Sequence, residues 1–440
     1  MKPFIKKSLY PLVLLTGLAL AISASAETEK IDKTFSVSKG GTLVIDSDLG
    51  SIDVETWDKG EVFVAVKKHA SSQKRLDSFE VQVEQRGDDI YVDGENERHN
   101  RVQVEFHVNV PREYNVDLKT GGGSIDVTDI SGNVKLDTSG GSISIGDVGR
   151  GDINAHTSGG SIKVGNVNGN VKVDTSGGGI SIGNVSGGNV NAHTSGGSIK
   201  VADVEGDLKV DTSGGSIHLG KITGISSIHT SGGSISVNQS GNDLKAHTSG
   251  GSINIGPSMG RVKVHTSGGS INVGMTDGDV DADTSGGSIK VEGSKGKVII
   301  HTSGGNLFVS SSGGPVKADT SGGNIKILQA KGAIDADTSG GSIEAEMIET
   351  DNSKDTHVSL HSSGGTITVY LPEKIEATIS AKLKISYFAV RDYMIYSDFP
   401  LSIKGEDSDR ITADGNINGG GDRIELSTTN GDIYIKKLKN

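Results

Sequence analysis

The chain of 440 residues contains no cysteine. This absence excludes disulfide bonds, thiolate metal sites, cysteine nucleophiles and a lipid-modified cysteine at a signal-cleavage site. The folded protein must therefore be stabilised by packing and hydrogen bonds alone. Aromatic residues are also scarce, since Phe308 is the only one between Tyr114 and Tyr370. A sugar ring would find almost nothing to stack on in this central part, which argues against a carbohydrate-cleaving enzyme.

Positive charge and long apolar runs are also in short supply. The formal net charge is −12, a balance that disfavours nucleic acid and anionic lipid as main partners. The longest apolar run, from Leu9 to Ile22, is shorter than the roughly 20 residues that a membrane-spanning helix needs. The sequence therefore predicts no transmembrane segment in the mature chain.

The first residues have the features of a secretory signal. Lys6 and Lys7 precede the apolar run, and Ala24-Ser25-Ala26 follows it with small residues at the positions a signal peptidase reads. We expect residues 1–26 to be a signal peptide that is cleaved between Ala26 and Glu27, with an uncleaved anchor as the alternative. The protein is then exported, to the periplasm, the cell surface or the extracellular space.

Glycine, in contrast, is abundant: 65 of the 440 residues, about twice the usual share. It recurs with a period, because the segment Asp/His-Thr-Ser-Gly-Gly appears twelve times, and nine of its eleven steps are 18 residues long. Its threonines are Thr138, Thr157, Thr175, Thr194, Thr212, Thr230, Thr248, Thr266, Thr284, Thr302, Thr320 and Thr338. Fixed self-similarity of this kind predicts a solenoid.

One repeat shows how a coil is built. From Val171 to Thr175 apolar and polar residues alternate, a Ser-Gly-Gly corner follows, and alternation resumes at Ile180 and Ile182. A period of two predicts short strands with the aliphatic residues and threonine inward. We expect the glycines at the corner because glycine adopts positive φ without steric cost.

The predicted fold class is all-β: an elongated β-solenoid of 18-residue two-strand coils with β caps at both ends. We predict an N-terminal β cap over 27–118, solenoid repeats over 119–369 and a C-terminal β cap over 370–440. Caps are expected because the open end of a solenoid exposes unpaired strand edges.

Several segments resemble the putative-adhesin family of exported bacterial β-strand-repeat proteins, a domain of unknown function. They are Gly40-Gly41-Thr42-Leu43, Gly50-Ser51-Ile52-Asp53-Val54-Glu55-Thr56-Trp57, the Ser-Gly-Gly-Ser-Ile repeats, Ser397-Asp398-Phe399-Pro400, Gly419-Gly420-Gly421 and Ser427-Thr428-Thr429-Asn430-Gly431-Asp432-Ile433. The resemblance implies a β-solenoid in the cell envelope or outside the cell. It supplies no catalytic residues.

Residue types that carry chemistry are plentiful but repetitive. Serine, histidine and aspartate recur in the coils, whereas a catalytic site needs one constellation with tuned pKa values. Calcium-binding β-rolls need an aspartate in each turn, and the corner here reads Thr-Ser-Gly-Gly-Ser-Ile without it. We therefore expect no catalytic residues, no cofactor and no enzymatic activity.

The residue before each threonine forms a predicted outward column of aspartates and histidines. It runs Asp137, His156, Asp174, His193, Asp211, His229, His247, His265, Asp283, His301, Asp319, Asp337 and His361. Neighbours about 4.8 Å apart can pair, which favours a structural role. The alternatives are a pH-sensitive face and metal capture, for which the candidates are His229, His247 and His265.

Aromatic residues return near the C-terminus at Tyr387, Phe388, Tyr393, Tyr396 and Phe399. They are expected to form the core of the C-terminal cap or, alternatively, a patch that contacts a partner.

The sequence favours an exported, non-enzymatic protein that acts as a binding protein, a spacer or an adhesin. It would present repeated side chains to a ligand of the envelope, the matrix or a host surface. The alternatives are a periplasmic structural or sensory component and a carbohydrate-active enzyme.

Overall fold

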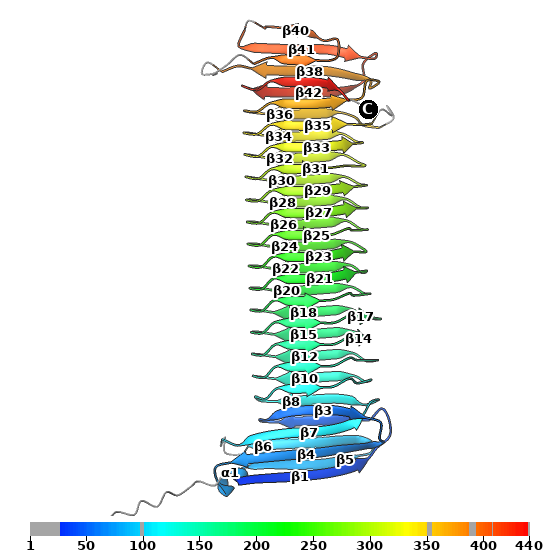
Figure 1. The fold of residues 1–440 in the computed structure, drawn as a ribbon, viewed down its shortest axis with the longest axis vertical. Helices are drawn as coiled ribbons and strands as arrows, with labels where there is room; N and C mark the ends of the chain where they lie inside the picture. The colour runs from blue at the N-terminus through cyan, green and yellow to red at the C-terminus, as the bar shows by residue number, and fades with distance from the viewer. Residues whose placement is uncertain (1–26, 97–100, 350–353, 387–392, 407, 439–440) are drawn as a thin grey trace, which may run out of the picture.

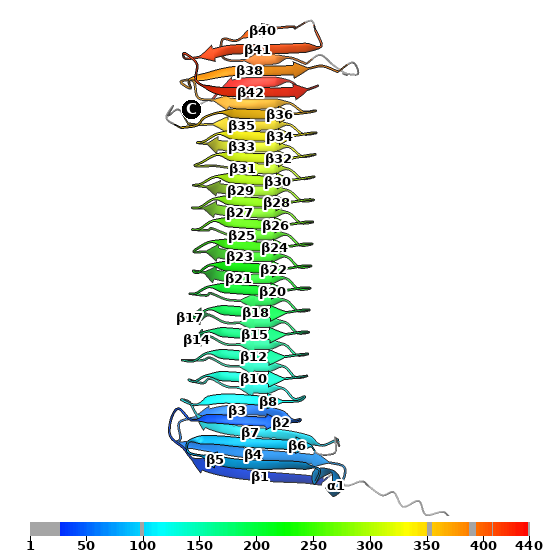
Figure 2. The same ribbon diagram turned by 180° about the vertical axis from the view of Figure 1, so that it is seen from behind.

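The computed structural model describes residues 27–96, 101–349, 354–386, 393–406 and 408–438, so the predicted signal peptide lies outside the described residues. The molecule is a long rod with the N-terminal part at one end and the C-terminal part at the other (Figures 1 and 2). Two sheets of mostly parallel strands, here called sheet A and sheet B, run the length of the rod. The predicted β-solenoid is confirmed.

Each coil contributes one strand to each sheet. The repeat strands of sheet B are β8 (Asn115–Thr120), β10 (Val134–Thr138), β12 (Ile153–Thr157), β15 (Val171–Thr175), β18 (Val190–Thr194), β20 (Leu208–Thr212), β22 (Ser226–Thr230), β24 (Leu244–Thr248), β26 (Val262–Thr266), β28 (Val280–Thr284), β30 (Val298–Thr302), β32 (Val316–Thr320), β34 (Ile334–Thr338) and β36 (Val358–Ser362). Those of sheet A are β9 (Ile125–Val127), β11 (Ile143–Ile145), β13 (Ile162–Val164), β16 (Ile180–Ile182), β19 (Ile199–Val201), β21 (Ile217–Ile222), β23 (Ile235–Ser240), β25 (Ile253–Ile255), β27 (Ile271–Thr276), β29 (Ile289–Ser294), β31 (Leu307–Val309), β33 (Ile325–Ala330), β35 (Ile343–Met347) and β37 (Ile367–Leu371). The short strands β14 (Val167–Asn168) and β17 (Val185–Ser186) pair with each other on a third side.

The core lies between the two sheets, and the alternation of the sequence places it there. In β15 the side chains of Val171, Val173 and Thr175 are buried, whereas Lys172 is exposed and Asp174 is half-buried. Adjacent coils pair in register, so Val173 lies between two equivalent alanines of the neighbouring strands. Stacking in register buries the aliphatic side chains of every coil against those of the next.

The inward threonines hold consecutive coils together. Thr175 Oγ1 donates a hydrogen bond of 2.7 Å to the carbonyl oxygen of Gly160 in the preceding coil. The same hydroxyl accepts a bond of 3.4 Å from the amide of Gly178 in its own corner. This arrangement recurs at the other corners, and at 362 a serine replaces the threonine and bonds to Gly341 at 2.8 Å. The buried Thr175 hydroxyl is thus satisfied as donor and acceptor.

The expected reason for the corner glycines is wrong. The glycines of positive φ are Gly40, Gly50, Gly87, Gly151, Gly169, Gly187, Gly405, Gly419 and Gly420, and none of them belongs to a Thr-Ser-Gly-Gly corner. The second corner glycine is required for close approach instead: a Cβ on Gly178 would collide with the carbonyl oxygen of Gly160. The close backbone stacking of coils, rather than a left-handed turn, selects glycine here.

The N-terminal end combines antiparallel strands with a coil of the stack. Its elements are β1 (Glu27–Ser36), β2 (Thr42–Ser47), β3 (Ser51–Trp57), β4 (Glu61–Ala70), the helix α1 (Gln73–Leu76), β5 (Phe79–Arg86), β6 (Asp89–Asn96) and β7 (Gln103–Pro111). β2 and β3 pair in parallel with β8 and β9, so they continue the stack. Beyond them, β1 is the last strand of sheet A and β5 the last of sheet B.

The C-terminal end is built in a similar way. Its strands are β38 (Ala377–Lys384), β39 (Ile395–Ser397), β40 (Ser402–Lys404), β41 (Arg410–Ile417), β42 (Asp422–Thr429) and β43 (Ile433–Lys437). β42 and β43 form a coil that lies between β36–β37 and β38–β39, although β38 and β39 precede it in sequence. The division of the chain into two caps and a repeat region stays a prediction.

The structure holds no helix, within the part of the chain that it describes, that is long and apolar enough to cross a membrane.

Candidate functional site

The Asp/His column defined above lies on the outer face of sheet B, and several of its members pair. His156 Nδ1 lies 3.1 Å from Asp174 Oδ1, and His265 Nδ1 lies 2.7 Å from Asp283 Oδ1. The side chains of these pairs are about 40% exposed (40–43%), where an ion pair contributes at most about 1 kcal/mol. The predicted pairing is found at three places in the column, His156–Asp174, His193–Asp211 and His265–Asp283, and its contribution to stability is small.

The three metal candidates are stacked rather than convergent. The ring centroids of His229 and His247 are 5.1 Å apart and those of His247 and His265 are 5.0 Å apart, with nearly parallel planes. Burial lowers the pKa of His247, and the charges of His265, His229 and Lys245 lower it further. Searched over its described residues, the structure shows no group of three histidine or carboxylate side chains placed to hold a metal ion. Burial and the neighbouring positive charges therefore disfavour protonation of His247.

Two carboxylates meet near the C-terminal end of the column. Asp319 and Asp337 are register partners on β32 and β34. Burial raises the pKa of Asp319; Lys317, 4.0 Å away, opposes this rise, and the charge of Asp335 and, to a smaller extent, that of Asp337 add to it. This is the one place in the column where two carboxylates are direct neighbours on adjacent described strands.

A second outward column on sheet B carries lysine and asparagine. Lys172 and Lys209 alternate with Asn154 and Asn191 on successive strands. Some members of this column are paired, as Lys263 is to Asp281 at 2.9 Å. From β12 to β20 the column presents amide and ammonium groups at the repeat distance of the coils, about 4.8 Å, whereas Asp281, Ile299 and Asp335 occupy the same position farther along.

Polar side chains at the corners serve the backbone. The Asp152 carboxylate accepts the amide of Asn170 at 2.8 Å, and the Asn170 side chain accepts the amide of Asn189 at 3.0 Å. Ladders of this kind stabilise the corners, so these residues have a structural role and are weak candidates for ligand contact.

The aromatic residues predicted near the C-terminus do not share one environment. Phe399 is buried at 6% exposure, Tyr393 is half-buried against the core, and Tyr396 is 49% exposed. Tyr387 and Phe388 lie outside the described residues. Tyr396 stacks on Tyr434, with ring centroids 4.9 Å apart. The sequence reasoning missed Tyr434, because only the pairing of β39 with β43 brings the two rings together.

A groove near the N-terminal end of the rod was also missed by the sequence reasoning. It has a volume of about 1000 Å³ and lies on the outer face of sheet A, where β7, β3, β9, β11 and β13 meet. Its lining includes the acidic residues Asp53, Glu55, Asp126, Asp129 and Asp147 and the basic residues His107, Arg112 and Lys163. β9, β11 and β13 belong to the repeat, but β7 joins β3 only through the fold of the N-terminal end, so the repeat does not predict that His107 lies beside them.

The chemistry of the groove centres on Asp53. Burial raises its pKa; His107, whose Nδ1 is 3.1 Å from Asp53 Oδ2, opposes this rise, and the charge of Asp126 adds to it. Asp53 and Asp126 are register partners on adjacent strands. The groove is open to solvent and has no aromatic residue in its lining, so it offers neither water exclusion nor a platform for a sugar ring.

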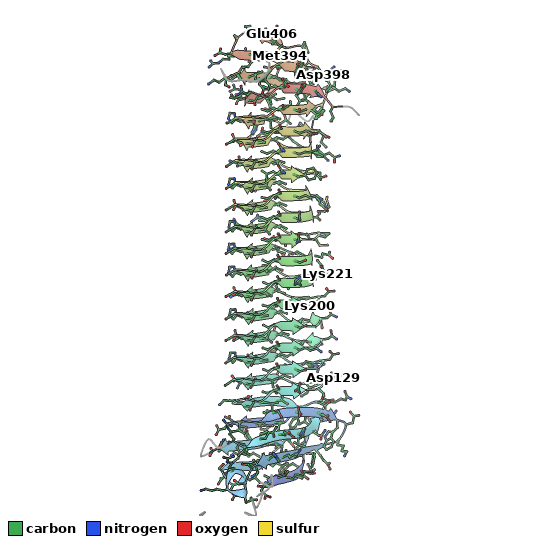
Figure 3. The ribbon with its side chains drawn as sticks, turned by 60° about the vertical axis from the view of Figure 1, so that its left-hand side comes forward. Asp129, Lys200, Lys221, Met394, Asp398 and Glu406 are labelled. Carbon is green, nitrogen blue, oxygen red and sulfur yellow. The ribbon has the colours of Figure 1, made fainter. Side chains whose placement is uncertain are left out.

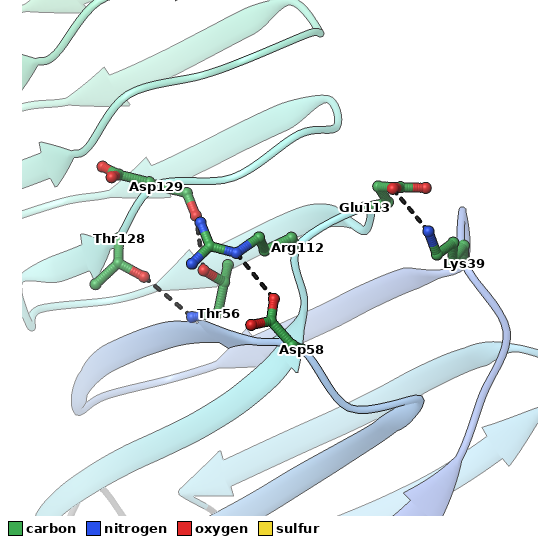
Figure 4. A network of polar contacts seen from close by, with 7 residues as sticks. All are labelled: Lys39, Thr56, Asp58, Arg112, Glu113, Thr128 and Asp129. Atoms are coloured by element: carbon green, nitrogen blue, oxygen red, sulfur yellow. Dashed lines mark hydrogen bonds and ion pairs between the residues drawn. The ribbon is translucent and has the colours of Figure 1, made fainter.

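A network beside the groove joins the N-terminal end to the first repeat coil (Figure 4). Arg112 Nε lies 3.1 Å from Asp58, and the Thr56 hydroxyl donates to the carbonyl oxygen of Asp129 at 2.8 Å. The amide of Thr56 donates to the Thr128 hydroxyl at 3.0 Å. Figure 3 shows Asp129 and Lys221 on the same long side of the rod. The network fixes the shape of the groove.

Comparison with known proteins gives distant structural likenesses. A putative cell adhesion protein from Clostridium sporogenes is 10% identical, with 94% of this chain and 100% of that chain covered and a TM-score of 0.16. A putative adhesin from Bacteroides fragilis is 14% identical, with 66% and 96% covered and a TM-score of 0.20. A putative lipid binding protein from Parabacteroides distasonis is 15% identical, with 79% and 97% covered and a TM-score of 0.17. Scores this low carry no argument about function.

No curated protein matches the chain. The family model described as Toastrack DUF4097 matches residues 41–274, which is more than half of the sequence. This match confirms the resemblance found in the sequence. The chain is therefore a member of the Toastrack DUF4097 family.

Proposed function

We propose that the protein is an exported, non-catalytic rod that binds a ligand or spaces two partners at the cell envelope or outside the cell. The observation that carries this proposal is the pair of outward columns on sheet B, in which Lys/Asn and Asp/His positions repeat in register on successive strands. Weak contacts that recur at a fixed spacing add their effects by raising the effective concentration of the next contact.

The predicted cleavage site supports export. Lys6 and Lys7, the apolar run from Leu9 to Ile22 and Ala24-Ser25-Ala26 before Glu27 have the order and lengths that a signal peptidase substrate needs.

The carboxylates of the groove do not support the enzyme alternative. A glycoside hydrolase needs an acid and a base or nucleophile around a bound sugar, and the groove beside Asp53 and Asp126 has no aromatic side chain to hold one. The Asp53 carboxylate is instead in contact with His107.

Location is the first test. The tagged protein is treated with protease on intact cells and on permeabilised cells. Digestion on intact cells is the expected result and agrees with a role in adhesion. Protection until permeabilisation would refute the surface location and favour the alternative of a periplasmic scaffold or sensor.

The number of coils is the second test. Deletion of residues 213–266 joins Thr212 to Ser267 and removes three complete coils without changing the register of the corner. The shortened chain should be released from cell envelopes at a lower salt concentration than the full chain, because fewer column contacts remain. Equal retention of the two chains would contradict multivalent binding. A chain with Met275→Ala serves as the control, since this exposed residue lies outside both columns.

A further inference from the structure

Lysine occupies every second coil along part of the outer face of sheet B. Lys172 lies on β15, Lys209 on β20 and Lys245 on β24, and all three side chains are exposed. Asn191 of β18 and Ser227 of β22 fill the same position in the coils between them. Consecutive lysines are therefore two coils, or roughly 10 Å, apart along the rod. These three lysines are called the lysine ladder.

The ammonium groups of the lysine ladder are available to a ligand. The lysines of the same column before and after the ladder are neutralised, Lys135 by Asp117 at 3.0 Å and Lys263 by Asp281 at 2.9 Å. Within the part of the chain that the structure describes, the ladder lysines have no ion pair and no hydrogen bond from Nζ. The ladder is thus a run of positive charge that the fold itself does not compensate.

Carboxylates on the same face reduce this positive potential. Asp174 and Asp211 follow two of the ladder lysines by two positions on β15 and β20, and each contacts a histidine, His156 at 3.1 Å and His193 at 3.2 Å. The chain as a whole has a net charge of −12. A densely charged polyanion would meet these carboxylates as well as the lysines. The surface therefore suits an anion of low charge density whose negative groups coincide with the ladder.

A groove of about 440 Å³ follows the ladder across β15, β18, β20 and β22. Lys172, Asn191 and Lys209 line it together with Asp207 and Ile225. The Asp207 carboxylate accepts the amide of Ile225 at 2.8 Å, and the Ile225 side chain is 55% exposed. Between two ammonium groups the groove thus presents a side-chain amide, which donates to and accepts from hydroxyls, and one apolar group.

Electrostatic repulsion within the sheet does not explain the two-coil spacing. Like charges directly opposite on adjacent strands destabilise a sheet, and this effect would keep lysines apart. However, Lys245 and Lys263 are direct register partners on β24 and β26. Repulsion therefore does not exclude lysine from adjacent coils, and the regular spacing of the ladder is a property that a ligand can use.

The ligand class follows from the chemistry and the spacing of the groove. A nucleic acid would need aromatic platforms for its bases, and the described lining of the groove holds no aromatic residue. A protein partner would need an apolar centre, and the large exposed apolar side chain of the groove is Ile225 alone among its described residues. In an extended polysaccharide each pyranose ring advances the chain by about the distance between neighbouring strands. A carboxylate on every second sugar therefore recurs with the period of the ladder.

We propose that the lysine ladder binds a linear, extended polysaccharide that carries one carboxylate on every second sugar, with its chain along the rod. Each carboxylate contacts one ladder lysine, and the hydroxyls of the sugars between them form hydrogen bonds with the side chains of Asn191 and Ser227. This inference rests on the proposed binding function and names the ligand class of one of its two columns.

The test measures the binding of oligomers to the purified protein by calorimetry at low and at physiological salt. The probe is a hyaluronan hexasaccharide, whose three carboxylates lie on alternate sugars, one for each ladder lysine. Its carboxyl-reduced form has the same backbone without the charge, and hexathymidylate is the nucleic-acid comparison. The hexasaccharide should bind about tenfold or more tightly than either comparison, and its binding should weaken as salt is added.

A ladder variant with Lys172→Gln, Lys209→Gln and Lys245→Gln keeps polar side chains at these exposed positions and removes the three charges. Because each exposed charge contact contributes a modest amount, the variant should bind the hexasaccharide about tenfold or more weakly than the wild type.

Two controls separate the position of the charges from their number. Lys163→Gln, Lys200→Gln and Lys221→Gln make the same charge change at exposed lysines of sheet A, and Figure 3 shows Lys200 and Lys221 on one long side of the rod. This sheet A variant should bind like the wild type. Asn191→Lys combined with Lys209→Asn conserves the net charge but moves one lysine to the adjacent coil, and it should weaken binding about threefold or more.

Each of the following results would overturn the proposal. They are no binding of the hexasaccharide, equally tight binding of its carboxyl-reduced form or of hexathymidylate, and binding that the ladder variant leaves unchanged. The same loss in the sheet A variant would show that only the total charge matters. An exchange of Asn191 and Lys209 without effect would refute the match between the two-coil spacing and the ligand.

Failure of this inference is distinguishable from failure of the proposed function. Release from cell envelopes depends on no particular ligand. Better retention of the full chain than of the coil-deleted chain, without binding of the hexasaccharide, would therefore refute the polysaccharide alone. Equal retention of the two chains together with binding of the hexasaccharide would refute multivalent binding at the envelope and leave the ligand of the ladder in place.

Discussion

The second glycine of each corner should tolerate no side chain, and the corner at Thr320 allows a direct test. A Cβ on Gly323 would lie within the van der Waals radius of the Gly305 carbonyl oxygen, whereas a Cβ on Gly322 would meet its nearest atom at 3.7 Å. Neither glycine has positive φ. Gly323→Ala and Gly322→Ala therefore differ in the approach of the neighbouring coil and in little else.

The magnitude follows from what must move. An ordinary contact of 3.5–4.0 Å requires the two coils to separate locally by roughly 1 Å or more. Such a separation would break the bond of 3.0 Å from Thr320 Oγ1 to Gly305 and the bond of 2.9 Å from the Leu307 amide to Asn324. With the strain of overpacking, Gly323→Ala should destabilise the protein by about 2–5 kcal/mol. Gly322→Ala should be neutral or stabilise it by about 0.4–1 kcal/mol.

Guanidinium unfolding of the two variants, followed by circular dichroism, measures this difference. Because a stack of coils need not unfold in one step, hydrogen exchange of the amides on β32 and β33 provides a local readout. Exchange there should accelerate in Gly323→Ala only. A difference between the variants of less than about 1 kcal/mol would refute the close-approach explanation.

Three further predictions concern the core and the histidine stack. Ser226 is buried without a hydrogen-bond partner for its Oγ, in a column where the flanking strands have leucine. Ser226→Leu should raise the free energy of unfolding by about 1–3 kcal/mol, while the exposed Ser227→Leu should change it little, and a loss of stability in Ser226→Leu would contradict the reasoning. The pKa of His247 is below 6.5 in the folded protein, so the unfolded chain takes up more protons as the pH falls and the free energy of unfolding should decrease. Between pH 7 and pH 5 the free energy of unfolding of His247→Asn should depend less on pH than that of the wild type. The same pH dependence in both proteins would argue against the shift. Thr175→Val leaves the Gly160 carbonyl without its donor and should cost about 1–3 kcal/mol in the same unfolding assay, whereas Thr175→Ser should restore most of the loss.

The repeat made the body of the fold predictable. A strict alternation of Val171, Val173 and Thr175 leaves only one register that buries the aliphatic side chains. The outward position of Asp174 and its pairing with His156 follow from the same alternation. Local pattern and global fold agree at these positions, so sequence reasoning succeeds.

The two ends were less predictable because they depend on pairings between distant segments. Nothing in the period indicates that β42–β43 should insert between β37 and β38, or that Tyr434 should lie under Tyr396. The groove is a similar case, since Asp53 and Asp126 become neighbours only when β3 pairs with β9. The predicted reason for glycine at the Thr-Ser-Gly-Gly corners was wrong for another cause. Positive φ and close backbone approach both select glycine, and the sequence alone does not distinguish between them.

Repetition and specificity have opposite requirements in this rod. Side chains that recur along the coils can contribute avidity along the length, but they cannot mark one point, because the same groups return a few coils farther on. A unique site needs residues that occur once, and in the described structure these gather where the antiparallel strands meet the stack: at Asp53 and His107 near one end and at Tyr396 and Tyr434 near the other. The stacked coils hold these two places a full rod length apart. A ligand recognised at one end is therefore held at a fixed distance from a ligand bound at the other end. The number of coils between the two ends sets this distance.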